Sequence, residues 1–266
     1  MEIQFYKYEG TGNDFVIIDD RSSLFPVRNH ALVKKLCNRR TGIGADGLIL
    51  IKEFPLFDFE MIYYNADGFE GSFCGNGSRC IVAFAHKLGL IQSEASFKAA
   101  DGTHKAKIIS YDSKSDKAEI EVEMKSAFPK LLNESAAFID TGSPHHIEFC
   151  NDVNQINVVE EGRRIRYSDP YGKAGANVNF VQAVPGGISI RTYERGVEDE
   201  TLSCGTGVVG SALASVNAGF VNDSGMVIVN TQGGILKVAY TQLNNSFDKI
   251  KLIGPVSLVF SGKIEI

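Results

Sequence analysis

The sequence has 266 residues, of which 44% are hydrophobic and 22% are charged, and its formal net charge is -5. This composition excludes a disordered or collagenous chain, and the length fits one large domain or two medium ones. A mildly acidic chain has no general attraction for phosphate backbones or anionic lipids, so we expect no nucleic-acid partner and no membrane partner. The N-terminus lacks the basic start and apolar run of a signal peptide, which predicts a cytoplasmic protein.

The elements expected along the chain form two similar series at an offset of 130 residues. Thr11-Gly12 recurs as Thr141-Gly142, and the motif Cys74 to Gly77 recurs as Cys204 to Gly207. Because several features recur in the same order, the repeat indicates two halves of related fold.

In the first series, a β-rich run at residues 61–64 enters a polar, glycine-containing turn ahead of Cys74. The stretch after the cysteine has the apolar spacing of a helix and ends at Gly89, a typical helix-ending residue. Two strand-like runs, 95–100 and 103–111, follow and turn at Asp101-Gly102. This half is therefore predicted to hold one long helix among mostly antiparallel strands.

The second series repeats this order. A β-rich run at 188–193 precedes Cys204, a helical stretch ends at Gly219, and strand-like runs follow at 226–230 and 235–240. We expect an α+β protein of two pseudo-symmetric halves with a cleft between them.

The two CGxG motifs are candidate sites for chemistry. Each lies where a strand and turn lead into a helix, where free backbone N–H groups and the positive end of the helix dipole bind anions. The same field favours thiolate over thiol, so Cys74 and Cys204 should titrate below the ~8.5 of free cysteine. Two such motifs facing each other would bind one carboxylate and place a sulfur on either side of the adjacent carbon.

This arrangement suits inversion at a carbon next to a carboxylate. One thiolate removes the proton, the other thiol returns a proton to the opposite face, and the helix N-termini stabilise the developing charge. The alternative reading of each cysteine alone is a small buried residue in a tight turn, as we expect for Cys37, Cys80 and Cys150. The five cysteines form no CxxC pair, so we expect no disulfide framework and no metal site.

Several motifs together resemble the diaminopimelate epimerase family, and they run in order through nearly the whole chain. They are Gly10 to Phe15, Gly42 to Gly47, Asn65 to Gly68, Cys74 to Arg79, Ser143 to His145, Glu194 to Gly196 and Glu200 to Gly207. The resemblance implies a pyridoxal-independent enzyme, without cofactor, that interconverts LL- and meso-diaminopimelate. It also implies a homodimer, and a fold in which each half is a barrel-like sheet around a central helix.

The resemblance also implies a role for each matching residue. Cys74 and Cys204 correspond to the acid/base cysteines, and the backbone N–H groups of Gly75, Asn76, Gly205 and Thr206 correspond to the carboxylate-binding helix ends. His145 and Glu194 match ionisable residues that tune the thiols. The side chains that match substrate-holding residues are Asn13, Asn65, Asn177, Glu194 and Arg195. Arg195 is suited to clamp a distal carboxylate bidentately.

The sequence departs from the family pattern in three places that concern substrate binding. Ser143 stands where many members have asparagine, and Gly47 stands where some members carry a glutamine that touches substrate. The segment Val197 to Glu200 is one residue longer than usual and should bulge outward. We expect its acidic side chains to be solvated.

The expected division of the chain places residues 1–112, with a returning segment at about 255–266, in the half that carries Cys74. Residues 113–254 form the half that carries Cys204, and the active site lies in the cleft between the two. The return of the C-terminal strands to the first half is implied by the resemblance alone.

Three other functions remain open from the residues. A related two-cysteine racemase would act on proline or hydroxyproline, which has no second polar end for Arg195 to bind. A hydrolase would use Cys74 as nucleophile with His145, and would leave the Cys204 motif without a role. A non-catalytic anion-binding module would use only the glycine turns, although neither turn matches a known phosphate-binding motif.

Overall fold

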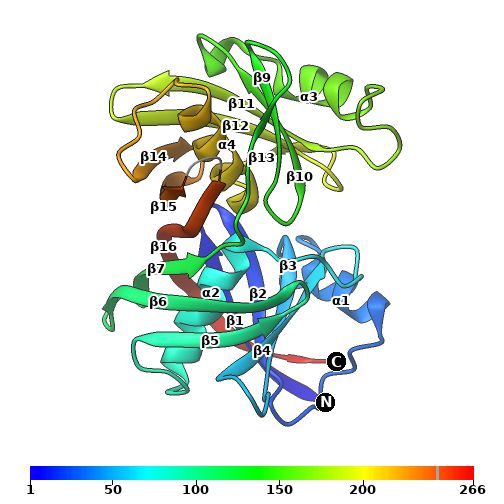
Figure 1. Cartoon of the computed structure of the whole chain (residues 1–266). Coiled ribbons are helices and arrows are strands. Elements are labelled where there is room, and N and C mark those ends of the chain that lie inside the picture. Colours follow the sequence, from blue (N-terminus) through cyan, green and yellow to red (C-terminus); the bar gives the residue numbers. More distant parts are fainter. Residues whose placement is uncertain (244–245) are drawn as a thin grey trace. The chain divides into compact units, whose positions relative to one another are not determined.

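The structure, a computed structural model, describes residues 1–243 and 246–266. The chain divides into two compact units (Figure 1): residues 1–122 with 254–266 form unit 1, and residues 123–253 form unit 2. Residues 113–122, which the sequence analysis assigned to the second half, belong to unit 1. The reason is that strand β7 (Lys117–Glu123) pairs with β6 (Gly102–Asp112) and with residues 254–257 of the last strand.

Unit 1, all of whose residues are described, is a closed eight-stranded barrel. Its strands, besides β6 and β7, are β1 (Glu2–Gly10), β2 (Asn13–Asp19), β3 (Gly47–Lys52), β4 (Phe59–Asn65), β5 (Glu94–Ala99) and the C-terminal part of β16 (Ser246–Glu265). The ring closes because β16 pairs with β7 on one side and with β1 on the other. The pairs β2–β3 and β4–β5 are parallel, and the other pairs are antiparallel.

Helix α2 (Gly75–Lys87) is the central element of unit 1 and packs against β1, β2, β3, β4 and β6. Every residue from Gly75 to Ala85 is buried, as expected for a helix enclosed on all sides. The helix ends where the sequence predicts, because Gly89 adopts a left-handed φ of 73°. The shorter α1 (His30–Cys37) covers the outside of the barrel and buries Val33, Leu36 and Cys37.

Unit 2 repeats this plan. Its strands are β8 (Lys130–Leu131), β9 (Ala136–Asp140), β10 (Pro144–Phe149), β11 (Asn177–Val184), β12 (Gly187–Glu194), β14 (Met226–Thr231), β15 (Gly234–Leu243) and the first part of β16, while the short β13 (Asp199–Thr201) pairs with β12. The parallel pairs are β10–β11 and β12–β14. They occupy the places that β2–β3 and β4–β5 hold in unit 1.

The helices of unit 2 also match those of unit 1. Helix α4 (Gly205–Asn217) follows β12 and β13 and is buried from Gly205 to Val216 among strands β9 to β12, β14 and β15. Helix α3 (Val158–Arg166), preceded by the short 3-10 helix η1 (Val153–Gln155), connects the parallel pair β10–β11 as α1 connects β2–β3. The prediction of two pseudo-symmetric halves, each a mostly antiparallel sheet around a long helix, is confirmed.

None of the helices in residues 1–243 and 246–266 has the length and apolar character needed to cross a membrane.

Candidate active site

Cys74 is the N-cap residue of α2 in unit 1. Its backbone is extended (φ -115°, ψ 112°), and its Sγ accepts a hydrogen bond of 3.4 Å from the Gly77 N–H. A sulfur at this position lies at the positive end of the helix dipole, where negative charge is stabilised. The structure therefore places Cys74 where the sequence predicts a thiolate-favouring site.

Asn13, a predicted substrate residue, lies beside Cys74. The Asn13 Oδ1 is 3.8 Å from Cys74 Sγ and accepts a 3.3 Å hydrogen bond from Asn76 Nδ2. The orientation of this amide is fixed on its other side, because Asn13 Nδ2 donates to the Asp46 carboxylate at 2.7 Å and a carboxylate only accepts. Cys74, Asn13 and Asn76 thus form one cluster.

A network of ion pairs holds the residues that contact this cluster. Asp14 pairs with Lys7 at 2.7 Å and with Arg39 at 2.7 Å, and Arg39 also pairs with Asp46 at 2.7 Å. Burial alone would raise the pKa of the Asp14 carboxyl, but hydrogen bonds from Arg39 and Lys7 outweigh it and hold the pKa well below its usual range. Through Arg39 the network holds the Asp46 side chain in place, and Asp46 in turn orients Asn13.

Arg79 is a fully buried cation that the sequence reasoning did not assign to the site. Its guanidinium donates to Asn76 Oδ1 at 3.0 Å, Thr11 Oγ1 at 3.2 Å and Gly75 O at 3.3 Å. Burial lowers its pKa to about 10, so it stays charged at neutral pH. Because arginine only donates, it fixes the Asn76 amide with its nitrogen towards Asn13. The spacing of three residues from Asn76 on a helix was the available signal.

Asn65 ends strand β4 opposite Gly47 of β3. Its backbone starts a tight turn, in which the Gly68 N–H donates to Asn65 O at 2.9 Å. The structure places Asn65 exposed at this strand end. Its role as a substrate residue stays a prediction.

Cys204 is the corresponding N-cap residue of α4 in unit 2. It is buried, with an extended backbone, and its Sγ lies 3.4 Å from the Thr206 hydroxyl. The Thr206 backbone carbonyl accepts a 2.9 Å hydrogen bond from Thr141, the threonine of the repeated Thr-Gly motif. This contact explains one part of the repeat, since Thr141 anchors the first turn of α4.

His145 reaches Cys204 through Thr206. Its Nε2 is 2.9 Å from the Thr206 hydroxyl and its Nδ1 is 3.1 Å from Asn179 Nδ2. The same Asn179 nitrogen lies 3.1 Å from the His146 backbone carbonyl, which can only accept, so this atom must be the amide nitrogen. The orientation of Asn179 is fixed further by the Thr192 hydroxyl, which donates to Asn179 Oδ1 at 2.9 Å.

These contacts determine the tautomer of His145. Because Asn179 donates to Nδ1, the histidine is neutral and carries its proton on Nε2, from which it donates to Thr206. Burial, together with the positive charge of Arg195, lowers the pKa of His145 to about 3. The Thr206 hydroxyl proton is then directed to Cys204 Sγ. The sequence predicted an ionisable neighbour, and the structure places a neutral hydrogen-bond relay there instead.

A second cluster in unit 2 contains Ser143, Asn177 and Arg195. Asn177 Nδ2 donates to Ser143 Oγ at 3.0 Å, and Asn177 Oδ1 accepts from the Arg195 backbone N–H at 2.9 Å. The Arg195 guanidinium donates to the Ala174 carbonyl at 3.3 Å and lies 3.5 Å from Ser143 Oγ. The Ser143 hydroxyl is therefore a partner for both residues.

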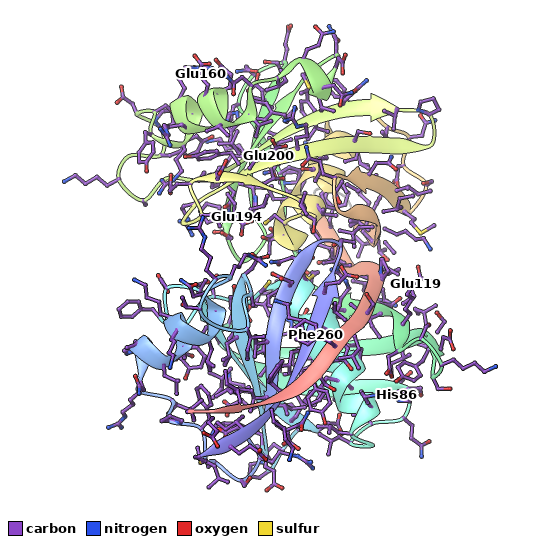
Figure 2. The ribbon with its side chains drawn as sticks, turned by 180° about the vertical axis from the view of Figure 1, so that it is seen from behind. His86, Glu119, Glu160, Glu194, Glu200 and Phe260 are labelled. Carbon is purple, nitrogen blue, oxygen red and sulfur yellow. The ribbon has the colours of Figure 1, made fainter. Side chains whose placement is uncertain are left out.

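Glu194 lies at the end of β12, next to Arg195, and Glu200 lies on the adjacent β13 (Figure 2). The Glu194 carboxylate accepts a 2.9 Å hydrogen bond from Thr201 of β13. Glu200 binds Arg191 through both carboxylate oxygens, at 2.7 Å each. The expectation of a solvated acidic segment is therefore wrong for Glu200, because Arg191 of the paired strand faces it.

Glu198 is also paired, with partners on α3 and the adjacent strand. Its carboxylate accepts from Arg166 at 3.0 Å, Tyr167 at 2.9 Å and Tyr193 at 3.0 Å, as well as from the Gly196 N–H. Burial alone would raise the pKa of Glu198, but these hydrogen bonds lower it to about 2. Glu198 has a left-handed φ of 60°, and its side chain turns inward to these partners rather than outward.

Replacing Glu198 with glutamine should lower the free energy of unfolding at neutral pH by about 1–2 kcal/mol, because a charged acceptor forms stronger hydrogen bonds than a neutral one. The folded pKa of about 2 lies below the ordinary value of 4.5. The contribution is therefore fully present above pH 4.5 and is lost as the pH falls towards 2. Urea unfolding of both proteins at neutral pH and in acid measures the difference, with the exposed Glu134→Gln as control. An equal difference in both conditions would contradict the assignment.

Of the remaining cysteines, Cys37 and Cys80 are buried and Cys150 is half-buried. All five cysteines lie in the described part of the chain, and none of them forms a disulfide. Burial raises the pKa of the Cys37 thiol to about 12 and also raises the pKa values of Cys80 and Cys150. Within residues 1–243 and 246–266, no group of three or more histidine, cysteine, aspartate or glutamate side chains is arranged to hold a metal ion.

The fold is shared with solved structures of low sequence identity. A phenazine biosynthesis protein of the PhzF family from Bacillus anthracis superposes with a TM-score of 0.79 at 14% identity, covering 100% of both chains. A hydroxyproline epimerase from Agrobacterium vitis superposes with a TM-score of 0.71 at 15% identity, covering 99% of this chain and 92% of the other. These similarities define the fold class of two related units around buried helices.

Sequence comparison identifies the family within this fold. The family model described as diaminopimelate epimerase matches residues 5–127 and 137–259, once in each half. The chain is 49% identical to a diaminopimelate epimerase of Flavobacterium psychrophilum, covering 98% of this chain and 100% of the relative. It is 37% identical to one of Aquifex aeolicus, with 98% of both chains covered. The chain belongs to the diaminopimelate epimerase family, whose members are isomerases.

Proposed function

We propose that this protein interconverts LL- and meso-diaminopimelate, in the synthesis of lysine and peptidoglycan precursors, by proton transfer between two cysteines and the α-carbon. The observation that carries the proposal is the duplicated site: a cysteine caps the buried central helix in each unit, and each cysteine has its own fixed hydrogen-bond cluster. Two proton-transfer groups are what inversion at one carbon requires.

In the proposed reaction, the substrate α-carboxylate binds the backbone N–H groups at the two helix N-termini. These groups belong to Gly75 and Asn76 in unit 1 and to Gly205 and Thr206 in unit 2. They are preorganised, so they stabilise the negative charge that develops on the carboxylate without solvent reorganisation. The positive end of each helix dipole lies at its N-terminus and adds to this stabilisation.

The two cysteines exchange one proton each with the α-carbon. One cysteine, as thiolate, removes the α-proton, and the electron pair of the C–H bond moves towards the carboxylate. The other cysteine, as thiol, donates its proton to the opposite face, which forms the new C–H bond and leaves a thiolate. The cysteine pair thus holds one proton before and after the reaction, and the reverse reaction exchanges the two roles.

The environment of Cys204 supports its role as a base. The Thr206 hydroxyl, oriented by the neutral His145, donates towards the sulfur, and a donated hydrogen bond favours the thiolate over the thiol. On the other side of the reaction, Asn13 Oδ1 is an acceptor beside Cys74. It suits the state in which Cys74 carries the proton.

The remaining predicted residues are proposed to hold the polar ends of the substrate. Arg195 can bind the distal carboxylate, with its orientation set by the Ala174 carbonyl and by Asn177. Asn13, Asn65, Asn177 and Glu194 are proposed to bind the ammonium and carboxylate groups. We propose that the two units close over the substrate, so that the two sulfurs face opposite sides of the α-carbon.

The experiment that tests the substrate assignment compares isomerisation of LL-diaminopimelate with that of L-proline and trans-4-hydroxy-L-proline, in the absence of pyridoxal phosphate. We expect turnover of diaminopimelate and none of either proline compound, because neither offers a second charged end to Arg195. Turnover of a proline compound in preference to diaminopimelate would support the racemase alternative, which the shared fold with a hydroxyproline epimerase keeps open.

We further propose that the enzyme is a cytoplasmic homodimer that needs no cofactor. The dimer is proposed from the family resemblance. The exposed apolar residues Val259 and Phe260 on β16 are 55% and 46% exposed and offer a surface for association (Figure 2). Sedimentation equilibrium should give twice the mass of one chain.

A further inference from the structure

We propose that the Tyr63 hydroxyl is a substrate-binding group of unit 1, in the place left by the missing side chain of Gly47. The inference rests on the proposed function, because the substrate it binds is the amino acid that Cys74 deprotonates. The Tyr63 hydroxyl would supply a polar group at Gly47, where the chain has no side chain of its own.

The Tyr63 ring is held between two glycines. A Cβ atom at Gly47 would lie 2.4 Å from Tyr63 Cε2 and 3.0 Å from its hydroxyl oxygen. A Cβ atom at Gly71 would lie 2.6 Å from Cε1 and 2.7 Å from Cδ1 of the same ring. Real Cβ atoms do not approach this closely, so the position of the ring requires glycine at both places.

Further contacts place this ring at the end of the barrel that carries Cys74. The ring packs edge-on against Phe15, with 6.0 Å between the ring centroids. Phe15 follows Asn13 and Asp14 on β2, and Gly47 follows Asp46, the residue that orients Asn13. The Asn65 Oδ1 lies 3.0 Å from the same Cβ position at Gly71 that the Tyr63 ring approaches.

The alternation of side chains along β3 shows to which side of the sheet Gly47 faces. Side chains two residues apart on a strand share a face, so a side chain at Gly47 would point to the same side as Ile49. Ile49 lies against the first turn of α2, with its Cδ1 2.9 Å from the Cβ position of Gly77. Gly47 therefore faces the helix side of the sheet, where the N-terminus of α2 lies.

Unit 2 shows what the fold places at the equivalent position. There Asn179 lies against the first turn of α4, with its Oδ1 2.4 Å from the Cβ position of Gly207, as Ile49 does at Gly77. Two residues before Asn179 is Asn177, the amide that pairs with Arg195 and Ser143. Gly47 is thus the counterpart of Asn177, and the Tyr63 hydroxyl supplies the polar group that Gly47 lacks.

A phenol suits this role chemically. Its hydroxyl both donates and accepts, so it can bind a carboxylate oxygen or an ammonium group of an amino acid. Its ring is held by packing and loses little side-chain freedom when substrate binds. Tyr63 is half-buried, which leaves part of the side chain accessible.

The test is the steady-state kinetics of Tyr63→Phe with diaminopimelate. Loss of one hydrogen bond to a charged group, about 1.5–3 kcal/mol, should raise KM by about 10- to 150-fold with kcat changed much less. The matched control is Tyr64→Phe on the neighbouring residue, whose hydroxyl donates to the Val27 carbonyl at 3.3 Å. This control should keep the wild-type KM.

A second measurement tests the packing without using activity. Gly71→Ala should lower the unfolding temperature in the wild-type background, and the loss should largely disappear when Tyr63→Ala is also present, because the closest atoms to the added Cβ belong to the Tyr63 ring. Additive effects of the two changes would overturn the placement of the ring, and an unchanged KM in Tyr63→Phe would overturn the binding role. Turnover by the wild type decides the proposed function separately.

Discussion

Replacing Cys74 or Cys204 with serine should lower the rate of epimerisation by about 10²- to 10⁴-fold, the range that positioned acid–base groups contribute. A serine hydroxyl is a far weaker acid than a thiol, so it can neither form the base nor return the proton at neutral pH. Each change removes one proton-transfer step of the reaction. Both directions of the reaction need both steps, so both variants should be nearly inactive in both directions.

The measurement is the initial rate from LL- and from meso-diaminopimelate, with circular dichroism to confirm that each variant is folded. Cys150→Ser is the matched control, because this cysteine lies outside both helix N-termini and burial raises the pKa of its thiol. It should keep nearly full activity. A Cys74→Ser or Cys204→Ser variant that keeps more than a small fraction of activity would rule out the two-base mechanism.

Replacing Asn179 with aspartate should lower kcat/KM by about 10- to 150-fold, since a hydrogen bond to a charged group contributes about 1.5–3 kcal/mol. The shapes of the two side chains are nearly the same. The amide of Asn179 donates a hydrogen bond to His145 Nδ1, whereas the new carboxylate can only accept one from it. This change raises the pKa of His145 and moves the proton of the neutral ring from Nε2 to Nδ1. Thr206 must then donate to Nε2, and Cys204 loses the hydrogen bond that favours its thiolate.

Nuclear magnetic resonance of labelled histidine distinguishes this effect from a general loss of structure. The wild type should show His145 neutral with its proton on Nε2, and the variant should show a proton on Nδ1. Asn230→Asp is the matched control, because Asn230 also donates to a backbone carbonyl, Ile188 O at 3.1 Å, but contacts no histidine. Equal kcat/KM values for the two variants would contradict the relay.

The repeated plan of the fold could be predicted from the sequence because each half repeats a cysteine, two glycines and a helical stretch in the same order. The pairings of β7 and of the shared strand β16 could not. Strand β16 pairs first with β15 in unit 2 and then with β7 and β1 in unit 1, so its two parts belong to different units. No local pattern indicates such a change of partner within one strand.

The site was predictable where a motif carries the chemistry and less so where a neighbouring strand supplies the partner. Cys74 and Cys204 followed from their places at helix N-termini. Asn179 was not predicted, although it alternates with Asn177 and so shares its strand face. Its function depends on the register of β10 with β11, which sets it beside His145 and His146. Sequence alone does not give that register.

Charge was the property that the sequence predicted least well. His145 was expected to act as an ionisable neighbour, but it is completely buried beside the positive Arg195, and both effects lower its pKa. Glu198 was expected in solvent, but it binds Arg166 and two tyrosines. In both cases the ionisation state depends on residues distant in the sequence.

The central claim is that two different groups remove and return the proton. The most direct measurement is to incubate the protein with LL-diaminopimelate in deuterated water, without cofactor, and to follow the isotope at the α-carbons early in the reaction. The account predicts meso product with deuterium at the inverted carbon, while the remaining LL substrate carries none. Product that keeps the original hydrogen at the inverted carbon would contradict the account.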